Sequence, residues 1–289
     1  MFGKPKKSLG QNFLIQPNIV SKIIFESKLE KDETVLEVGP GRGALTRALL
    51  TAGAKVVAVE KDDDLFTELH ETFAKEISEK KLILVRGDIL ELLSRTKIHL
   101  TPNPSPKGRG ETAENPLPFG EGAGGEVSSR FTVVANIPYY ITGELLRHML
   151  SGKVQPYRMT LMVQKEVATR IVAKDGHESL LSISVKAYGM PRYAGTVGKG
   201  NFYPVPKVDS AILQVENISK NFFQNFSEEK FFSVLHLAFA HKRKLLLNNL
   251  SSLVSKPQLT ALFLERNLSL KSRAEELSLA DWGYLVERL

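Results

Sequence analysis

Short apolar runs and amphipathic stretches alternate along the first two thirds of the chain. The runs are typical of buried strands and occur at residues 34–38, 55–59, 82–85, 131–135, 159–163, 193–197 and 208–215. The stretches between them have apolar residues at helical spacing, which predicts helices at residues 17–28, 44–52, 62–78, 142–150 and 164–170. Residues 180–188 fit either a helix or a strand. This alternation predicts an α/β fold with a mainly parallel, doubly wound sheet of seven strands.

Two regions depart from this rhythm. Residues 101–130 are rich in Pro and Gly, have few apolar positions and are of low complexity. We expect an insertion there, because the runs on both sides fit the sheet and closure entropy grows slowly with loop length. From about residue 217 the pattern becomes helical, with Phe231 and Leu235 on one apolar face. The sequence therefore predicts an α/β domain over residues 1–216 and a small all-α domain over residues 217–289.

The size and composition of the chain suit a large domain and a small one. It has 289 residues, of which 42% are hydrophobic. No run approaches the ~18 consecutive apolar residues of a membrane span, and the amino terminus lacks the apolar core of a signal peptide. We expect a cytoplasmic protein that does not bind membranes, and a monomer.

The charged, cysteine and histidine residues narrow the chemistry. The chain has no cysteine, which excludes disulfides, thiolate metal sites and a thiol nucleophile. The six histidines lack the helical spacing of metal ligands, so we expect no metal. The 39 Lys+Arg against 32 Asp+Glu give a net charge of +7, which favours a polyanionic partner.

A glycine turn follows the first predicted strand, at residues 39–43. Such glycines let the backbone approach a ligand, and the helix that follows presents free N–H groups. Alone the turn is weak evidence, because NAD-binding folds use a similar device and a plain turn is also compatible. Glu60 lies 21 positions after Gly39, where a carboxylate accepts hydrogen bonds from both ribose hydroxyls. Asp88, after the third strand, can accept from an adenine amine, and together these residues predict an adenosine pocket.

The segment Asn136-Ile137-Pro138-Tyr139 follows the fourth strand. It offers an amide oxygen, a constrained carbonyl and a flat ring within one turn, which are the groups needed to hold a planar amine. An ordinary turn after a strand is the alternative, because Asn and Pro are common turn formers. Beside an adenosine pocket, this segment favours transfer of a methyl group over transfer of a hydride.

Five segments, in order, resemble the KsgA family of ribosomal RNA adenine dimethyltransferases. They are KSLGQNFL at residues 7–14, EVGPGRGALT at 37–46, NIPY at 136–139, QKEVA at 164–168 and FYPVPKVDSA at 202–211. The resemblance runs from Lys4 to about Leu250. The insertion and Tyr140 depart from the family pattern.

The resemblance implies a class I, Rossmann-like methyltransferase fold and S-adenosylmethionine as the methyl donor. It also implies small-subunit ribosomal RNA, in an immature small subunit, as the acceptor, with two adjacent adenosines near its 3′ end each methylated twice. By resemblance, the donor site contains Gln11, Asn12, Leu14, Gly39, Gly41, Glu60, Asp88 and Asn136. Asn12 and Leu14 would close over the donor, while Gly39 would lie under its amino-acid portion.

Asn136 would also serve the acceptor. Hydrogen bonds from the adenine amine to the Asn136 side-chain oxygen and the Pro138 carbonyl would stabilise the charge that develops on nitrogen. A base stacked in a helix cannot reach such a pocket, so it must be flipped or unpaired. Tyr139 and Phe202 are the candidates to stack on it, although Phe202 also fits a place in the core.

Basic residues are expected to contact the RNA backbone, and the helical domain over residues 217–289 to recognise the RNA. The candidates are Lys4, Lys6, Lys7, Lys207, Lys242, Arg243 and Lys244. Compensation of a helix dipole is an alternative role for the last three. Two other functions stay open: a large-subunit rRNA methyltransferase that confers macrolide resistance, and a non-enzymatic RNA-binding assembly factor of the same fold.

Overall fold

The computed structural model describes residues 5–98, 130–174 and 176–289. The predicted insertion lies outside the described residues except for Arg130, and Lys4 lies outside them as well. The chain forms two compact units, one of Met1–Lys165 with Arg192–Glu216 and the other of Glu166–Pro191 with Asn217–Leu289.

The second unit contains a segment that the sequence placed in the first domain, residues 166–191. The side chain of Tyr188 explains this difference. Its hydroxyl donates to the Glu228 carboxylate, and its ring lies 5.0 Å from the Phe223 ring. The backbone N–H of Glu178 also donates to the carbonyl of Glu275 at 2.8 Å. These contacts join distant parts of the chain, and the pattern of apolar residues in the sequence does not reveal them.

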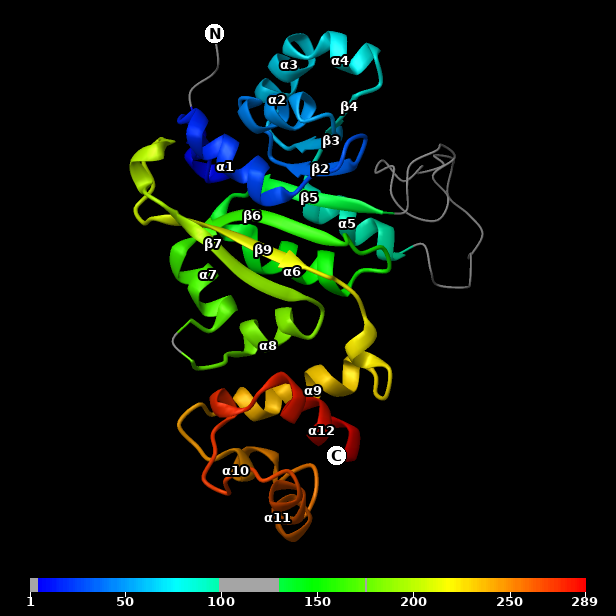
Figure 1. Cartoon of the computed structure of the whole chain (residues 1–289), viewed down its shortest axis with the longest axis vertical. Coiled ribbons are helices and arrows are strands. Elements are labelled where there is room, and N and C mark those ends of the chain that lie inside the picture. The colour runs from blue at the N-terminus through cyan, green and yellow to red at the C-terminus, as the bar shows by residue number, and fades with distance from the viewer. Residues whose placement is uncertain (1–4, 99–129, 175) are drawn as a thin grey trace. The chain divides into compact units, whose positions relative to one another are not determined.

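All seven apolar runs form one sheet, in the order β4-β3-β2-β5-β6-β9-β7 (Figure 1). The strands are β2 (Thr34–Val38), β3 (Lys55–Glu60), β4 (Leu82–Arg86), β5 (Phe131–Asn136), β6 (Arg158–Gln164), β7 (Met190–Val197) and β9 (Ser210–Glu216). The pairs from β4 to β6 are parallel, and β9 pairs antiparallel with β6. The predicted Rossmann-like, mainly parallel sheet is confirmed.

Four predicted regions of the first unit form helices close to their expected limits, and residues 89–98 form a helix that the sequence analysis did not predict. The helices are α1 (Pro17–Ser27), α2 (Ala44–Thr51), α3 (Asp63–Thr72), α4 (Ala74–Ser78), α5 (Ile89–Ile98) and α6 (Thr142–Ser151). The single helix expected over residues 62–78 is broken at Phe73, whose backbone leaves the helical region. The Phe73 ring is buried against Gly43, where an added Cβ would lie only 2.6 Å from it.

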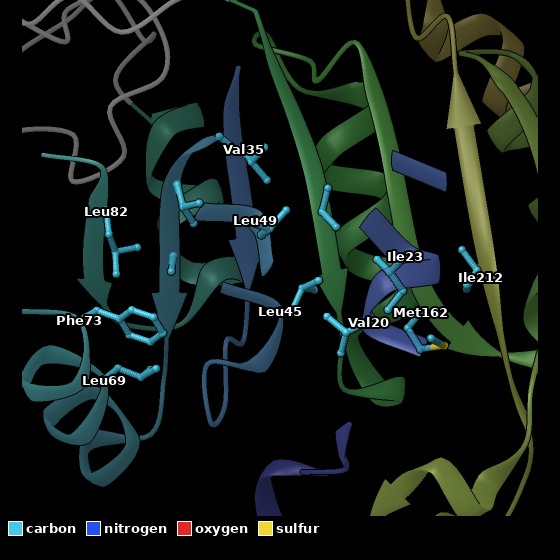
Figure 2. Packing of buried hydrophobic residues seen from close by; sticks show 14 of the residues in the cluster. Val20, Ile23, Val35, Leu45, Leu49, Leu69, Phe73, Leu82, Met162 and Ile212 are labelled. Atoms are coloured by element: carbon cyan, nitrogen blue, oxygen red, sulfur yellow. The ribbon is translucent and has the colours of Figure 1, made fainter. Parts of the chain in front are cut away.

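A hydrophobic cluster joins the first helices to the sheet (Figure 2). Val20 and Ile23 of α1, with Leu45 and Leu49 of α2, belong to the same cluster as Val35 of β2. Burying each side chain contributes roughly 1.5–3 kcal/mol. The neighbouring strand positions, which face the other side of the sheet, are buried too and include Leu36, Val57 and Val133. Both faces of the sheet are therefore covered, which leaves its strand ends to form the site.

A second, two-stranded sheet brings the amino-terminal segment to the aromatic and proline loop. In it β1 (Phe13–Leu14) pairs antiparallel with β8 (Phe202–Tyr203). The short helix η1 (Lys7–Leu9) precedes β1. We call residues 6–14 the strap, because they lead to the pocket described below.

The second unit is helical. Its helices are α7 (Lys165–Val172), α8 (Leu180–Lys186), α9 (Glu228–Phe239), α10 (Leu246–Leu250), α11 (Lys256–Glu265) and α12 (Leu279–Arg288). The ambiguous residues 180–188 form a helix because Ser179 caps it. Trp282, Phe231 and Phe263 are fully buried in this unit. None of the helices in the described ranges is long and apolar enough to cross a membrane.

Candidate active site

One pocket lies where the parallel strands β2, β3, β4 and β5 end. It encloses about 1000 Å³, counting the open solvent at its mouth. Ten of the residues that the sequence assigned to catalysis and donor binding line it: Gln11, Asn12, Leu14, Gly39, Gly41, Glu60, Asp88, Asn136, Pro138 and Tyr139. Phe202 is not among the lining residues. Carboxyl ends of strands are where open α/β sheets bind ligands.

The glycine turn after β2 forms the floor of the pocket. Gly39 and Gly41 have φ angles of +67° and +60°, a region that favours glycine. A Cβ added at Gly41 would lie 2.9 Å from the Phe13 ring, so a side chain would clash there. The N–H of Gly41 donates to Glu60 Oε2 at 3.1 Å. The turn thus holds the carboxylate of the next strand in place.

Glu60 ends β3 and is 5% exposed. Besides Gly41, the backbone N–H of Asp62 donates to its Oε1 at 2.8 Å. Burial raises the pKa of Glu60, and the hydrogen bonds from Asp62 and Gly41 oppose that rise. A carboxylate held at both oxygens is fixed in orientation, and its remaining lone pairs can accept from the hydroxyls of a ribose.

Asp88 follows β4 and forms an ion pair that the sequence did not indicate. Lys61 Nζ lies 2.8 Å from Asp88 Oδ2, and the N–H of Leu90 donates to Oδ1 at 2.8 Å. Burial favours a higher pKa for Asp88, but the Lys61 ammonium and the Leu90 N–H hold the pKa below its usual value. Asp88 is therefore an ionised hydrogen-bond acceptor at the pocket. Lys61 also lines the pocket and is a candidate site residue that the sequence analysis missed.

Glu37 is a second buried acid to which the sequence assigned no role. It lies in β2 just before the glycine turn, lines the pocket and is 1% exposed. Thr46 Oγ1 donates to its Oε2 at 2.7 Å. Burial raises the pKa of Glu37 to about 8. The sequence signal was available, because an acid inside an otherwise apolar strand is unusual.

The strap is held over the pocket by Asp62, a buried residue two positions after Glu60. Its carboxylate accepts from Lys6 Nζ at 2.6 Å and from Gln11 Nε2 at 2.7 Å. Lys6 also bonds Asp64 at 2.7 Å. The sequence assigned Lys6 to RNA phosphates; in the structure its ammonium pairs with the carboxylates of Asp62 and Asp64, which the sequence did not indicate.

Asn136 ends β5, and the strap fixes the orientation of its side chain. Its Nδ2 donates to the carbonyl of Asn12 at 2.9 Å. Since the two ends of an amide point in different directions, this bond sets which side presents Oδ1. Pro138, also at the pocket, supplies a backbone carbonyl and no backbone donor. The two residues together provide acceptors for an amine.

Of the two stacking candidates, Tyr139 lines the pocket, as do the aromatic residues Phe13 and Tyr140. Burial raises the pKa of the Tyr139 hydroxyl, and a hydrogen bond with Ser210 Oγ at 2.6 Å opposes the rise. Phe202, the other stacking candidate, is 1% exposed and packs in the hydrophobic cluster of α1 and α2. Side chains alternate along β8, so the exposed partner is Tyr203, 52% exposed. The structure therefore does not support stacking by Phe202 in this conformation.

The remaining basic candidates are spread over both units. Lys207 is exposed in the first unit, beyond β8. Lys242, Arg243 and Lys244 are exposed in the second unit, after the end of α9. Lys7 lies in η1, and Lys4 lies outside the described residues. Within the described ranges, no group of three or more His, Cys, Asp and Glu residues could hold a metal ion.

The fold and the pocket together define a class I methyltransferase: a mainly parallel Rossmann-like sheet with a glycine turn and acids at its strand ends. The family model for ribosomal RNA adenine dimethylase matches residues 3–289, and the chain belongs to this family. It is accordingly an rRNA adenine dimethyltransferase, which confirms the resemblance and favours an enzyme over a non-enzymatic assembly factor.

Relatives and solved structures agree with this assignment. A ribosomal RNA small subunit methyltransferase A of Dehalococcoides mccartyi strain CBDB1 is 38% identical over 284 residues, covering 98% of this chain and 87% of that protein. The crystal structure of a dimethyladenosine transferase from Plasmodium falciparum has a TM-score of 0.71 at 25% identity, covering 94% of this chain and 95% of that one. The 23S rRNA methyltransferase ErmE shares the fold, with a TM-score of 0.69 at 24% identity over 96% of this chain and 99% of that one.

Proposed function

We propose that this enzyme uses S-adenosylmethionine to dimethylate two adjacent adenosines near the 3′ end of small-subunit rRNA in an immature small subunit. The printed names of its relatives at 36–38% identity support the small subunit. The large-subunit alternative rests on likeness to a structure at 24% identity, which concerns the fold alone. The observation that carries the proposal is the fixed Asn136 amide beside the pocket.

The residues at the pocket fit the donor. Gly39 leaves room for close approach of its amino-acid portion, because the position of an added Cβ there has only Pro138 Cδ, at 4.0 Å, near it. Glu60 would accept from the ribose hydroxyls, and Asp88 from the adenine amine. Gln11, Asn12 and Leu14 would cover the donor from the strap. When bound, the donor supplies a methyl group on a positively charged sulfur.

Asn136 and Pro138 would activate the acceptor. An adenine amine is a poor nucleophile because its lone pair is conjugated with the ring. Hydrogen bonds from the amine to Asn136 Oδ1 and the Pro138 carbonyl favour a tetrahedral nitrogen and stabilise its developing positive charge. The N–C bond forms as the C–S bond breaks, the electron pair of that bond stays on sulfur, and the nitrogen then loses a proton to solvent. No strong base is required.

Presentation of the base involves other parts of the chain. The adenosine must leave the stack, and Tyr139 would then contact its face, a contact worth ~1–3 kcal/mol. Lys207, Lys242, Arg243 and Lys244 are the exposed cations that we assign to RNA phosphates, and we assign recognition of the RNA to residues 217–289. We infer a cytoplasmic location, which an rRNA substrate supports, and a monomer.

The proposal is tested with methyl-labelled donor and ribosomal subunits that lack the modification. Incubation with small subunits should place label in N6,N6-dimethyladenosine, while large subunits should stay unlabelled. Label that appears only in large subunits would contradict the assigned substrate. Absence of label from both, with donor binding intact by calorimetry, would contradict the proposed reaction.

A further inference from the structure

A hydrogen bond joins two segments that are 71 residues apart in the sequence. The hydroxyl of Tyr139 lies 2.6 Å from Ser210 Oγ. Ser210 is the first residue of β9 and pairs with Gln164 of β6, inside the central sheet. The Ser210 side chain is 0% exposed. The partner of the tyrosine therefore lies on a buried, paired strand of the central sheet.

The Tyr139 ring is held at both ends by this bond. Its Cβ end is fixed by the backbone of η2 (Tyr139–Ile141), directly after Asn136 and Pro138. Its hydroxyl end is fixed by Ser210. Burial raises the pKa of the Tyr139 hydroxyl, so it stays protonated at neutral pH and keeps the bond. A buried serine hydroxyl also needs a partner, because an unmade hydrogen bond is unfavourable in the interior.

We propose that Ser210 is a positioning residue for the acceptor base: it fixes the Tyr139 ring so that a stacked adenine presents its amine to Asn136 Oδ1 and the Pro138 carbonyl. This inference rests on the proposed function. Ser210 does not touch the reacting atoms and acts through Tyr139. The sequence singled out the segment that contains Ser210, at residues 202–211, without a role for this serine.

Accurate placement of the base matters because the methyl transfer needs the nitrogen in line with the donor. A misplacement of about 1 Å can lower a rate on the order of 100-fold. The second transfer is the more sensitive one. The monomethylated amine has one N–H fewer to bond Asn136 and Pro138, so its position depends more on the ring beneath it. Loss of the Ser210 bond should therefore slow the second transfer more than the first.

The test compares three variants of the full chain. Ser210→Ala removes the partner, and Tyr139→Phe removes the hydroxyl while it keeps the ring. Ser27→Ala is the matched control, because Ser27 is also 0% exposed and its hydroxyl also makes one hydrogen bond, to the Ile23 carbonyl in α1. Each variant is assayed for turnover, KM for the RNA, donor affinity and the ratio of monomethylated to dimethylated adenosine.

We expect Ser210→Ala and Tyr139→Phe each to lower kcat by about 10- to 100-fold, with donor affinity unchanged and monomethyladenosine accumulating. The double variant should be no worse than either single one, because both remove the same bond. Ser27→Ala should lower thermal stability to a similar extent without changing the product ratio.

Turnover and product ratio in Ser210→Ala equal to those of Ser27→Ala would overturn the positioning role. Additive losses in the double variant would overturn it as well, and Tyr139→Phe keeps the inference testable if Ser210→Ala does not fold. The proposed function fails separately, when the unmodified enzyme transfers no methyl group to small subunits.

Discussion

The two halves of the pocket are built from different chemistry. The half that we assign to the donor, at the ends of β2, β3 and β4, contains the carboxylates of Glu60 and Asp88. It also contains Glu37, which is mostly protonated at neutral pH because burial raises its pKa to about 8. The half that we assign to the acceptor, at the end of β5, contains an amide, a backbone carbonyl and a protonated phenol, from Asn136, Pro138 and Tyr139. One half is acidic and the other is neutral.

This difference separates binding from chemistry. Carboxylates suit a donor that carries hydroxyls, an amine and a positive charge, so damage to that half should appear mainly in donor affinity. The acceptor half needs oriented dipoles that interact most strongly when charge develops on the amine, so damage there should appear mainly in turnover. Substitutions in each half of the pocket test whether donor affinity and turnover depend on different residues.

The largest effect is expected at Asn136. Replacement by Ala removes the acceptor oxygen and should lower kcat by about 10²–10³-fold or more, the scale seen when one oriented dipole is lost. Donor affinity should fall by less than about tenfold. Single-turnover methylation gives the first quantity and calorimetry gives the second. Equal losses in both would show that the halves are not separate.

Glu60 should give the opposite pattern. Glu60→Gln keeps the shape but removes the charge that accepts from the ribose, and bonds to charged groups contribute about 1.5–3 kcal/mol. We expect donor affinity to fall by about 10- to 100-fold, while kcat at saturating donor stays within about threefold. Donor titration and turnover at high donor concentration check this. A large loss of kcat with unchanged affinity would refute the assignment.

Glu37 predicts a dependence of stability on pH. Its folded pKa is raised from 4.5 to about 8 by burial, so the folded state binds the proton more tightly than the unfolded chain does. Its contribution to stability is full below about pH 4.5 and is lost as pH rises towards 8. Over this range the equilibrium constant for folding falls by at most about tenfold for each pH unit.

Glu37→Gln abolishes this titration. The variant should therefore gain stability relative to the unmodified protein between pH 5 and pH 8, as measured by chemical denaturation. A difference between the two proteins that does not change over this range would contradict the raised pKa.

The smallest effect is expected at Lys6, which holds the strap. Lys6→Met breaks the ion pairs with Asp62 and Asp64; the Lys6 side chain is 41% exposed, and ion pairs that water reaches are weak. We expect the donor to dissociate roughly twofold to fivefold faster, with kcat for the methyl transfer itself unchanged. Stopped-flow donor release measures this, with Lys55→Met, an exposed lysine of β3, as the control. Equal release rates would show that the strap does not retain the donor.

The sheet and the acids at its strand ends could be predicted because their signals are local. An apolar run bounded by glycine indicates a strand, and an acid directly after it indicates a strand-end carboxylate. The roles of Phe202 and Lys6 could not be read in this way. Which residue of β8 faces the core depends on its pairing with β1, and the partner of Lys6 is 56 positions away. The role of Ser210 could not be predicted for the same reason, because its hydrogen-bond partner Tyr139 lies in another part of the chain.

The most direct test of the account is mass-spectrometric mapping of small-subunit rRNA after reaction with the unmodified enzyme and with Asn136→Ala. We predict dimethyladenosine at two adjacent positions near the 3′ end with the unmodified enzyme, and at most traces with the variant while it still binds donor. Equal modification by both enzymes, or modification at unrelated positions only, would contradict the claim that Asn136 activates these adenosines.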